Sequence, residues 1–183
     1  MVDFSGSHVV VTGGTGALGR AVIGALRKAG AVCHVPNLMA AELDDFPYST
    51  DPGVHIGRGV DLADEAAVRR FYQALPPLWA SIHLAGGFAM APIGEMSAED
   101  FMAQFRMNAL SCFLCSAAAV AAFRARKELG PGGAPGGRIV NIAARFAGVS
   151  STEGATALTQ ICSSVVSCAS AWVSAATADL DAV

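Results

Sequence analysis

Short apolar runs alternate along the chain with longer segments in which apolar positions recur at helical spacing. The runs at residues 8–12, 31–36, 54–60, 79–84 and 138–143 predict buried strands. The segments at 20–29, 65–75 and 97–127 predict helices. Strands that alternate with helices of this length form βαβ units with right-handed crossovers. The pattern therefore predicts an α/β fold, a doubly wound parallel sheet of about five strands in three layers.

Local signals mark several ends of these elements. Gly30 follows the helix at 20–29 as a C-terminal cap, and Ser97 opens S-A-E-D, the pattern of a capping box. Residues 130–137 are all Gly, Pro or Ala, which predicts a surface loop. The chain shows no internal repeat or linker, so we expect residues 1–183 to form a single domain.

Composition narrows the classes of partner. Apolar residues make up 53% of the chain and charged residues only 15%, which favours burial of some helix faces against a second copy in a homo-oligomer. The net charge of −3 offers no basic patch, so we expect neither nucleic acid nor an anionic membrane surface as partner. Residues 154–178 are uncharged, but eight Ser or Thr make a buried helix a better prediction than a membrane span.

The five cysteines are an odd number, and the N-terminus lacks the charged start and apolar core of a signal peptide. Reduced thiols in a cytoplasm fit this pattern best. Cys112 and Cys115 have metal-ligand spacing, but no second pair or nearby histidine completes a tetrahedral set. We therefore expect no metal site.

The segment T-G-G-T-G-A-L-G at 12–19 joins the first predicted strand to the first predicted helix. Such a turn lies at the carboxyl edge of a parallel sheet, where helix amides and the helix dipole favour a phosphate. Gly13, Gly14 and Gly16 allow positive φ and a close approach of backbone to a pyrophosphate, and Gly19 allows close packing of the helix on the strand. The threonine hydroxyls can add hydrogen bonds. The alternative is a tight turn without a ligand.

This turn is followed by Asp61-Leu62, H-L-A-G-G at 83–87, Asn108 in M-N-A and G-R-I-V-N-I at 137–142. In order and spacing these motifs resemble the short-chain dehydrogenase/reductase family over residues 5–148. The resemblance implies a Rossmann-type sheet that binds NAD or NADP, with 61–62 beside the adenine and 85–86 beside the ribose. The expected cofactor contacts are Thr12, Gly13, Gly14, Thr15, Gly16, Ala17, Leu18, Gly19, Asn37, Asp61, Leu62, Ala85 and Gly86. Ala17 stands where the commonest form of the motif has its second glycine, whereas Gly16 fits the variant T-G-x-x-G-x-x-G.

The end of the second strand usually separates NAD from NADP, because an acid there binds the ribose hydroxyls and repels a 2′-phosphate. This chain has Asn37 at that place, followed by Leu38, so it offers neither an acid nor an arginine. Asn37 can pair with ribose hydroxyls, which favours NAD. A turn-forming role for Asn37 after Pro36 is an equal alternative.

The resemblance also implies a catalytic tyrosine, a lysine four residues later, a serine on the preceding strand and an asparagine in the long helix that organises a proton-relay water. Asn108 matches the asparagine, but the serine place falls on Ala144, after Ala143. The places of tyrosine and lysine fall on Ala157 and Ile161, or, with a two-residue insertion, on Thr159 and Ser163. The tyrosines of the chain are Tyr48 and Tyr72, and its last lysine is Lys127.

Three functional interpretations follow. The first is an NAD(P)-dependent oxidoreductase that acts on an alcohol or carbonyl and is impaired in this chain. The second is a non-catalytic dinucleotide-binding or scaffold protein. The third is a truncated product without function, which lacks the family's last two strands. His83 could act as an acid or base. A hydrogen-bonded strand histidine is the favoured interpretation. Residues 149–183 differ in composition from the rest and indicate a shifted reading frame, a truncation or an Ala-rich helix.

Overall fold

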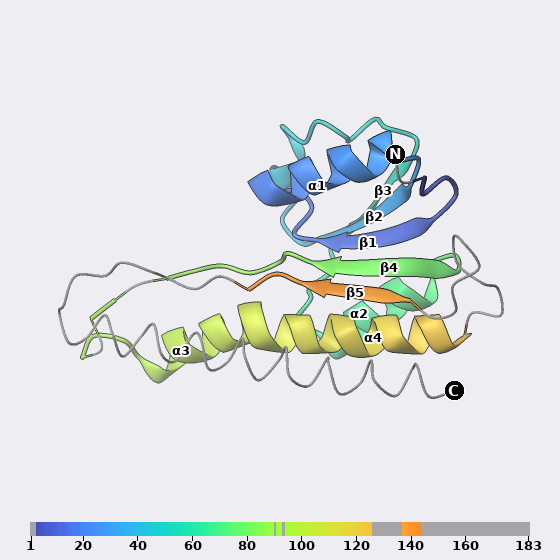
Figure 1. Cartoon of the computed structure of the whole chain (residues 1–183). Helices are drawn as coiled ribbons and strands as arrows, with labels where there is room; N and C mark the ends of the chain where they lie inside the picture. The colour runs from blue at the N-terminus through green and yellow to red at the C-terminus, as the bar shows by residue number, and fades with distance from the viewer. Residues whose placement is uncertain (1–2, 90, 93, 126–136, 144–183) are drawn as a thin grey trace.

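A parallel five-stranded sheet with the strand order β3-β2-β1-β4-β5 organises the chain (Figure 1). The computed structural model describes residues 3–89, 91–92, 94–125 and 137–143. The strands are β1 (His8–Thr12), β2 (Val32–Asn37), β3 (Val54–Arg58), β4 (Leu78–His83) and β5 (Arg138–Asn141). The helices are α1 (Ala17–Lys28), the 3₁₀ helix η1 (Ala40–Leu43), α2 (Glu65–Gln73), α3 (Ala98–Phe105), the π-helical segment η2 (Arg106–Leu110) and α4 (Ser111–Ala125). The predicted α/β fold with a Rossmann-type parallel sheet is confirmed.

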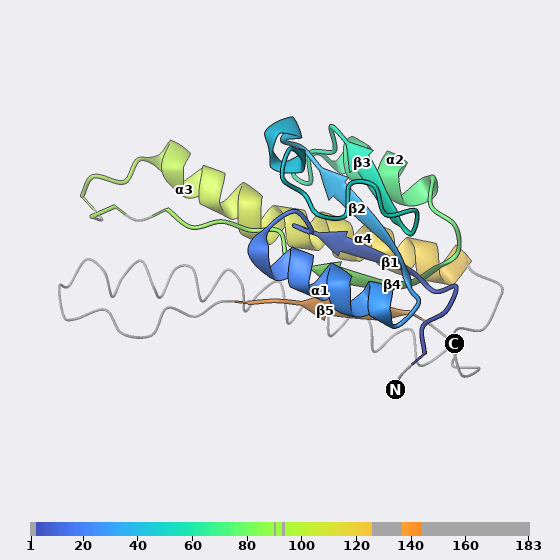
Figure 2. The same ribbon diagram turned by 90° about the horizontal axis from the view of Figure 1, so that it is seen from above.

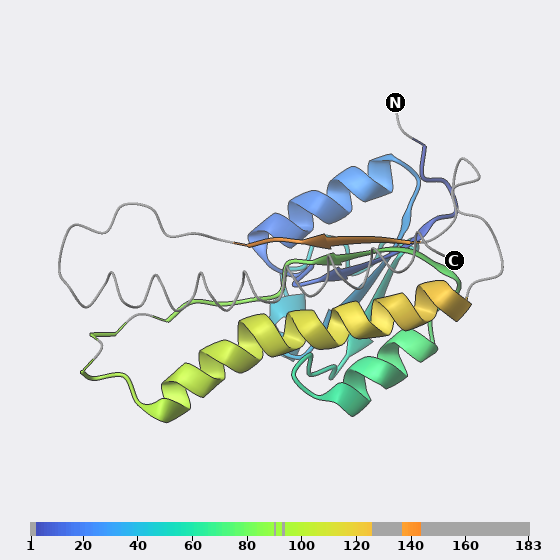
Figure 3. The ribbon, with the colours of Figure 1, turned by 60° about the horizontal axis from the view of Figure 1, so that its bottom comes forward.

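Helices cover both faces of the sheet, which gives three layers. Helix α1 lies on one face, and α2 and α4 lie together on the other (Figures 1 and 3). The valines of β1 serve both sides: Val9 and Val11 pack beneath α1, and Val10 packs beneath α2 and α4. All three are fully buried, which explains why this strand is continuously apolar rather than alternating.

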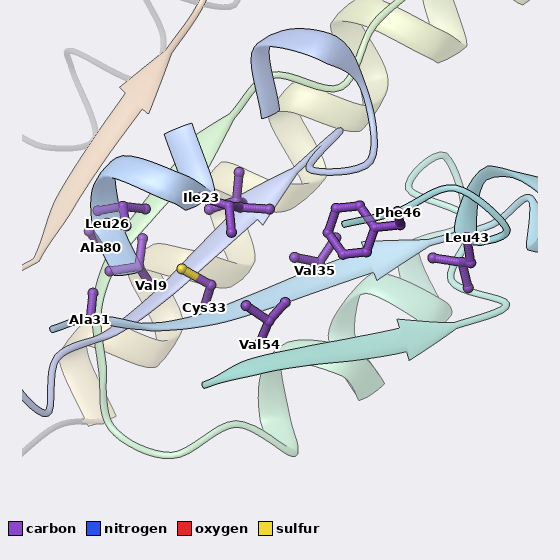
Figure 4. Packing of buried hydrophobic residues seen from close by; sticks show 11 residues of the cluster. Val9, Ile23, Leu26, Ala31, Cys33, Val35, Leu43, Phe46, Val54 and Ala80 are labelled. Atoms are coloured by element: carbon purple, nitrogen blue, oxygen red, sulfur yellow. The ribbon is translucent and has the colours of Figure 1, made fainter. Parts of the chain in front are cut away.

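The larger core cluster lies between the sheet and α1 (Figure 4). Ile23 and Leu26 of α1 meet β1 and β2 there, and Leu43 and Phe46 close the cluster from the segment after β2. Seen from above, α1 overlies the sheet (Figure 2). Burial of these side chains holds both α1 and the segment after β2 in place.

Helix α1 begins at Ala17, three residues before the predicted start, and ends close to the predicted place. Gly30 has φ of 87°, its N–H donates to the Arg27 carbonyl (3.0 Å), and the Ala31 N–H donates to the Leu26 carbonyl (3.0 Å). These two bonds form a Schellman motif, so the predicted glycine cap is confirmed. The early start places residues 17–19 in the first helical turn.

The long helical run after β4 spans α3, η2 and α4. The predicted capping box is confirmed: Ser97 Oγ accepts from the Asp100 N–H (3.1 Å), and the Asp100 carboxylate accepts from the Ser97 N–H (3.0 Å). Helix α3 extends past the carboxyl ends of the strands (Figures 1 and 3). By length and composition alone, Ala98–Ala125 could cross a membrane, a test that core helices of soluble proteins also pass.

Some of the sequence predictions concern residues that the structure does not describe. Residues 130–136 of the loop predicted at 130–137, and the segment 149–183 with its three interpretations, lie outside the described residues. The 3₁₀ helix η1 is an addition that apolar periodicity did not indicate. Within the described part of the chain, no group of three or more His, Cys, Asp or Glu residues could hold a metal ion.

Three histidines form a row across neighbouring strands. His8 Nδ1 and His34 Nε2 share a hydrogen bond of 2.9 Å, and the rings of His34 and His55 stack with centroids 5.2 Å apart. Burial, together with His8 and His55 nearby, lowers the pKa of His34 to about 4. His34 is therefore neutral at pH 7.

This row predicts loss of stability in acid. Because the folded pKa of His34 lies below its ordinary value of 6.5, the unfolded chain binds the additional proton as the pH falls. The contribution of neutral His34 to the free energy of unfolding is complete above about pH 6.5 and is lost towards pH 4. We expect the free energy of urea unfolding to fall between pH 7.5 and 4.5, and to fall by about 1–2 kcal/mol less in His34→Val. Equal pH dependence in both proteins would contradict this assignment.

Candidate functional site

The turn between β1 and α1 presents backbone donors at the carboxyl edge of the sheet. Gly13 has φ of 64°, and the Gly16 N–H donates to its carbonyl (3.1 Å). No side chain caps α1 and its first turn carries no acid. The N–H groups of residues 17–19 have no acceptor within the helix, because they belong to its first turn. They form a positive helix end suited to an anion.

The glycines of this turn have different structural roles. A β-carbon on Gly19 would lie 2.2 Å from the Gly13 carbonyl oxygen, and one on Gly13 would lie 2.7 Å from the Ala85 nitrogen. A β-carbon on Gly14 would meet the side chain of Val35 at 2.8 Å. Close packing therefore requires all three.

Gly16 differs from its neighbours. A β-carbon there would meet only the Gly13 carbonyl, at 3.4 Å. Gly14 and Gly16 are not among the glycines with positive φ, so the expectation of that conformation holds only at Gly13. The Gly13 backbone is fixed by packing, whereas Gly16 faces open space where a ligand can approach.

Both threonines of the turn are buried and bonded within the chain. Thr12 Oγ1 accepts from the backbone N–H groups of Leu84 and Ala85, each at 3.2 Å. Thr15 Oγ1 donates to the Glu42 carboxylate at 2.7 Å. Thr12 thereby ties the glycine turn to the segment that follows β4, and Thr15 ties it to the segment that follows β2.

Asn37 ends β2 and is buried. Its Nδ2 donates to Glu42 Oε2 at 2.9 Å, and its carbonyl accepts from the Val60 N–H at 3.1 Å. Glu42 of η1 thus brings a carboxylate to the end of β2, which inspection of the strand end alone missed. The only sequence signal was an acid five positions after Asn37, in a segment not recognised as helical.

The other expected contacts lie along the same edge or beside it. Asp61 Oδ1 accepts from the Ala63 N–H (2.8 Å) just beyond β3, and Leu62 packs against the core cluster beneath α2 and α4. Ala85 and Gly86 lie just beyond the end of β4, after Leu84. The structure therefore gathers the ends of β1, β2 and β4 at one edge, and places 61–62 after β3.

Asn108 lies in the π-helical segment and holds the segment after β4. Its Oδ1 accepts from the Gly87 N–H (3.0 Å), and its Nδ2 donates to the carbonyls of Gly87 (3.0 Å) and Gln104 (2.9 Å). A β-carbon on Gly86 would lie 2.6 Å from Asn108 Oδ1. The carboxamide therefore fixes the path of residues 86–87 beside the glycine turn. Such π-helical segments occur frequently at functional sites.

His83 is a buried structural histidine. Its Nε2 shares a hydrogen bond of 2.9 Å with Ser81 Oγ, and its Nδ1 shares one of 2.8 Å with Asn141 Oδ1 of β5. Burial lowers the pKa of His83 to about 4. The ring is therefore neutral at pH 7 and links β4 to β5, which agrees with the favoured interpretation of a hydrogen-bonded strand histidine.

Neither tyrosine lies at the glycine turn. Tyr72 is buried beneath the sheet, where its hydroxyl shares a hydrogen bond of 2.7 Å with Ser81 Oγ. Burial raises the pKa of Tyr72 well above its ordinary value. Tyr48 packs edge-on against Phe46, with ring centroids 5.7 Å apart, and its hydroxyl lies beside Gly24 of α1. Both phenols are therefore side chains of the core and its margin.

The sheet order and the uncapped helix after β1 define the class as a Rossmann-type α/β domain. The family model for short chain dehydrogenases matches residues 7–157. The chain belongs to the short-chain dehydrogenase/reductase family. The expected membership is confirmed, while the roles of the site residues stay predictions.

Solved structures share the fold. The chain is similar to a serine dehydrogenase from Escherichia coli, with 20% identity, a TM-score of 0.66, and coverage of 91% of this chain and 71% of that one. It is also similar to a short-chain dehydrogenase/reductase from Vibrio parahaemolyticus, with 16% identity, a TM-score of 0.72, and coverage of 95% and 78%. A comparison with curated proteins gives no match. At these identities the likeness concerns the fold.

The packing of the turn predicts losses of stability of different size for two glycine substitutions. Gly19→Ala places a methyl group against the Gly13 carbonyl, so we expect a loss of stability on the order of 2–3 kcal/mol. Gly16→Ala is the matched control and should cost less than about 1 kcal/mol, because its methyl group enters open space. Urea unfolding measures both. Equal losses would show that the turn packs differently.

Proposed function

We propose that this chain binds a nicotinamide dinucleotide at the glycine turn and belongs functionally among oxidoreductases of alcohols and carbonyls, with hydride transfer impaired. The observation that carries the proposal is the uncapped first turn of α1. The amides of residues 17–19 have no acceptor within the helix, and they lie next to Gly16, which faces open space. Family membership supports the same ligand class.

The residues of the edge fit the parts of such a ligand. The amides of the first turn would hold the diphosphate, and Asn37 with Glu42 would face the adenosine ribose. Asp61 and Leu62 are proposed beside the adenine, and 85–86 beside the ribose. The dinucleotide, when bound, supplies or accepts the hydride.

We infer that hydride transfer is impaired from the residues that stand at the family's places for proton transfer. Transfer of a proton to or from a substrate oxygen requires a positioned acid or base, worth about 10²–10⁴ in rate. The family places for tyrosine and lysine carry Ala157 and Ile161, or Thr159 and Ser163. Tyr72 cannot replace the phenol, because its hydroxyl is buried against Ser81. Asn108 keeps its place in the helix but carries no titratable proton.

A non-catalytic dinucleotide-binding or scaffold protein is the second candidate, favoured by the burial of Tyr72 and of His83 away from solvent.

Exposed apolar side chains on α3, among them Phe101, Met102 and Phe105, support association with a second copy. We further propose that residues 1–183 act as one domain in a cytoplasmic protein.

Charge at the first turn of α1 tests the binding site. Leu18 is 54% exposed, so Leu18→Glu should leave the fold intact and even stabilise the helix by about 0.3–1 kcal/mol. The same charge repels a diphosphate, and we expect the NADH dissociation constant to rise at least about tenfold. Fluorescence titration measures binding and thermal unfolding measures stability. Leu18→Gln, the uncharged control, keeps the backbone amides and should bind NADH more tightly than Leu18→Glu; equal affinity of these two variants would place the ligand elsewhere.

Restoring the proton-transfer pair tests impairment. The double substitution Ala157→Tyr with Ile161→Lys, or Thr159→Tyr with Ser163→Lys, should raise NADH-dependent carbonyl reduction by about 10²-fold or more in the register that matches the site. Single substitutions serve as controls. Turnover by the parent chain equal to that of the better double variant would refute impairment. Binding without turnover in every variant would support the non-catalytic candidate.

A further inference from the structure

The Glu42 carboxylate is fixed against the glycine turn by two buried donors. Its Oε2 accepts from Thr15 Oγ1 at 2.7 Å and from Asn37 Nδ2 at 2.9 Å. Thr15 and Asn37 are 8% and 4% exposed. One oxygen thus joins the end of β2 to the turn that begins α1. Among the described residues, Oε1 of the same carboxylate has no hydrogen-bond donor from the chain, so it can accept from a ligand.

The backbone that carries Glu42 is held on the C-terminal side of this residue. Leu43 and Phe46 are buried in the core cluster beneath α1. Arg20 donates through Nε to the Thr15 carbonyl (2.7 Å) and pairs with the Asp45 carboxylate (2.7 Å). Packing and an ion pair therefore fix the segment, and the two hydrogen bonds to Oε2 hold the carboxylate of Glu42, an exposed residue, in one place.

This position is where a ribose would lie. In a Rossmann-type sheet the diphosphate sits at the first helix, and the adenosine ribose lies towards the end of the second strand. Glu42 contacts the turn that leads into the first helix through Thr15, and it contacts the end of the second strand through Asn37. A carboxylate there can accept hydrogen bonds from vicinal hydroxyls, whereas a 2′-phosphate would bring two further negative charges against it.

Arg58 is the opposing group to consider. It ends β3 and is paired in register with Asn37, so it lies one strand farther from the glycine turn. In the described part of the chain Arg58 forms no ion pair, and it is exposed. A cation here could hold a 2′-phosphate, but Glu42 is hydrogen-bonded directly to Thr15 of the turn and to Asn37, and Arg58 makes neither of these contacts. The direct contacts favour Glu42 as the deciding group.

We propose that Glu42 is the specificity-determining residue of this site and selects NAD(H) over NADP(H) by accepting ribose hydroxyls and repelling a 2′-phosphate. The proposal rests on dinucleotide binding at the glycine turn. In this proposal, the acid that decides between NAD(H) and NADP(H) lies in the 3₁₀ helix after β2 rather than at the end of β2. The role of Asn37 is to hold that acid in place.

Binding of the two nucleotides tests the proposal without turnover. Dissociation constants for NADH and NADPH are measured by fluorescence titration with the full chain, Glu42→Gln and Arg58→Gln. We expect the parent chain to bind NADH at least about tenfold more tightly than NADPH, since a single charge repulsion at contact is of this order. In Glu42→Gln that ratio should shrink about tenfold, mainly through tighter NADPH binding. Arg58→Gln should leave the ratio within about threefold.

The salt dependence of binding separates a preference that arises from charge from one that arises from the shape of the site. Because the discrimination is electrostatic, raising the salt from low to high concentration should narrow the ratio in the parent chain and change it little in Glu42→Gln. Glu42→Asp keeps the charge, and it should retain the preference for NADH even where thermal unfolding shows that Glu42→Gln loosens the segment.

Three results would overturn the proposal. The parent chain could bind NADPH as tightly as NADH, or the ratio could persist in Glu42→Gln, or Arg58→Gln could be the variant that changes it. Each of these leaves dinucleotide binding intact. Failure of the parent chain to bind either nucleotide at millimolar concentration is a different outcome, which contradicts the proposed function and removes the ribose on which the role of Glu42 depends.

Discussion

The contact between the first turn of α1 and the end of β1 is the constraint on which the site depends. The Gly13 carbonyl occupies the space that a β-carbon on Gly19 would need, 2.2 Å away, and Gly14 is pressed against Val35 in the same way. This contact brings the helix against the strand and aims its first-turn amides along the carboxyl edge. A side chain at either position would push the amides away from that edge.

Three hydrogen-bonded links hold the rest of the edge to this contact. Thr12 joins the turn to the segment after β4, and Asn108 holds that segment from the helical run beyond it. Glu42 joins the turn to the end of β2 through Thr15 and Asn37. The edge therefore combines amide donors with one fixed carboxylate, a pairing that suits a ligand with a diphosphate and neighbouring hydroxyls. Neither tyrosine supplies a phenol at this edge: Tyr72 is bonded to Ser81 beneath the sheet, and Tyr48 packs against Phe46 and beside Gly24.

Local sequence signals predicted the elements, and tertiary contacts decided what they missed. The apolar run of β1, the Gly30 cap and the Ser97 capping box each depend on a few neighbouring residues, and the structure confirms them. The start of α1 was placed too late, because glycine and the small residues before Arg20 have the composition of a turn while packing makes 17–19 helical. Glu42 was missed because its position depends on the burial of Leu43 and on Arg20, 22 residues earlier in the chain. The bond between His83 and Asn141 spans 58 residues, so no local pattern indicates it.

The most direct test of the central claim follows the backbone amides themselves. In an amide NMR titration with NADH, the account predicts the largest chemical-shift changes at Ala17, Leu18 and Gly19, with smaller changes at residues 85–87 and none at the buried amides of α4. Saturable binding that leaves the amides of 17–19 unmoved would contradict it, because the uncapped helix end would then hold no diphosphate.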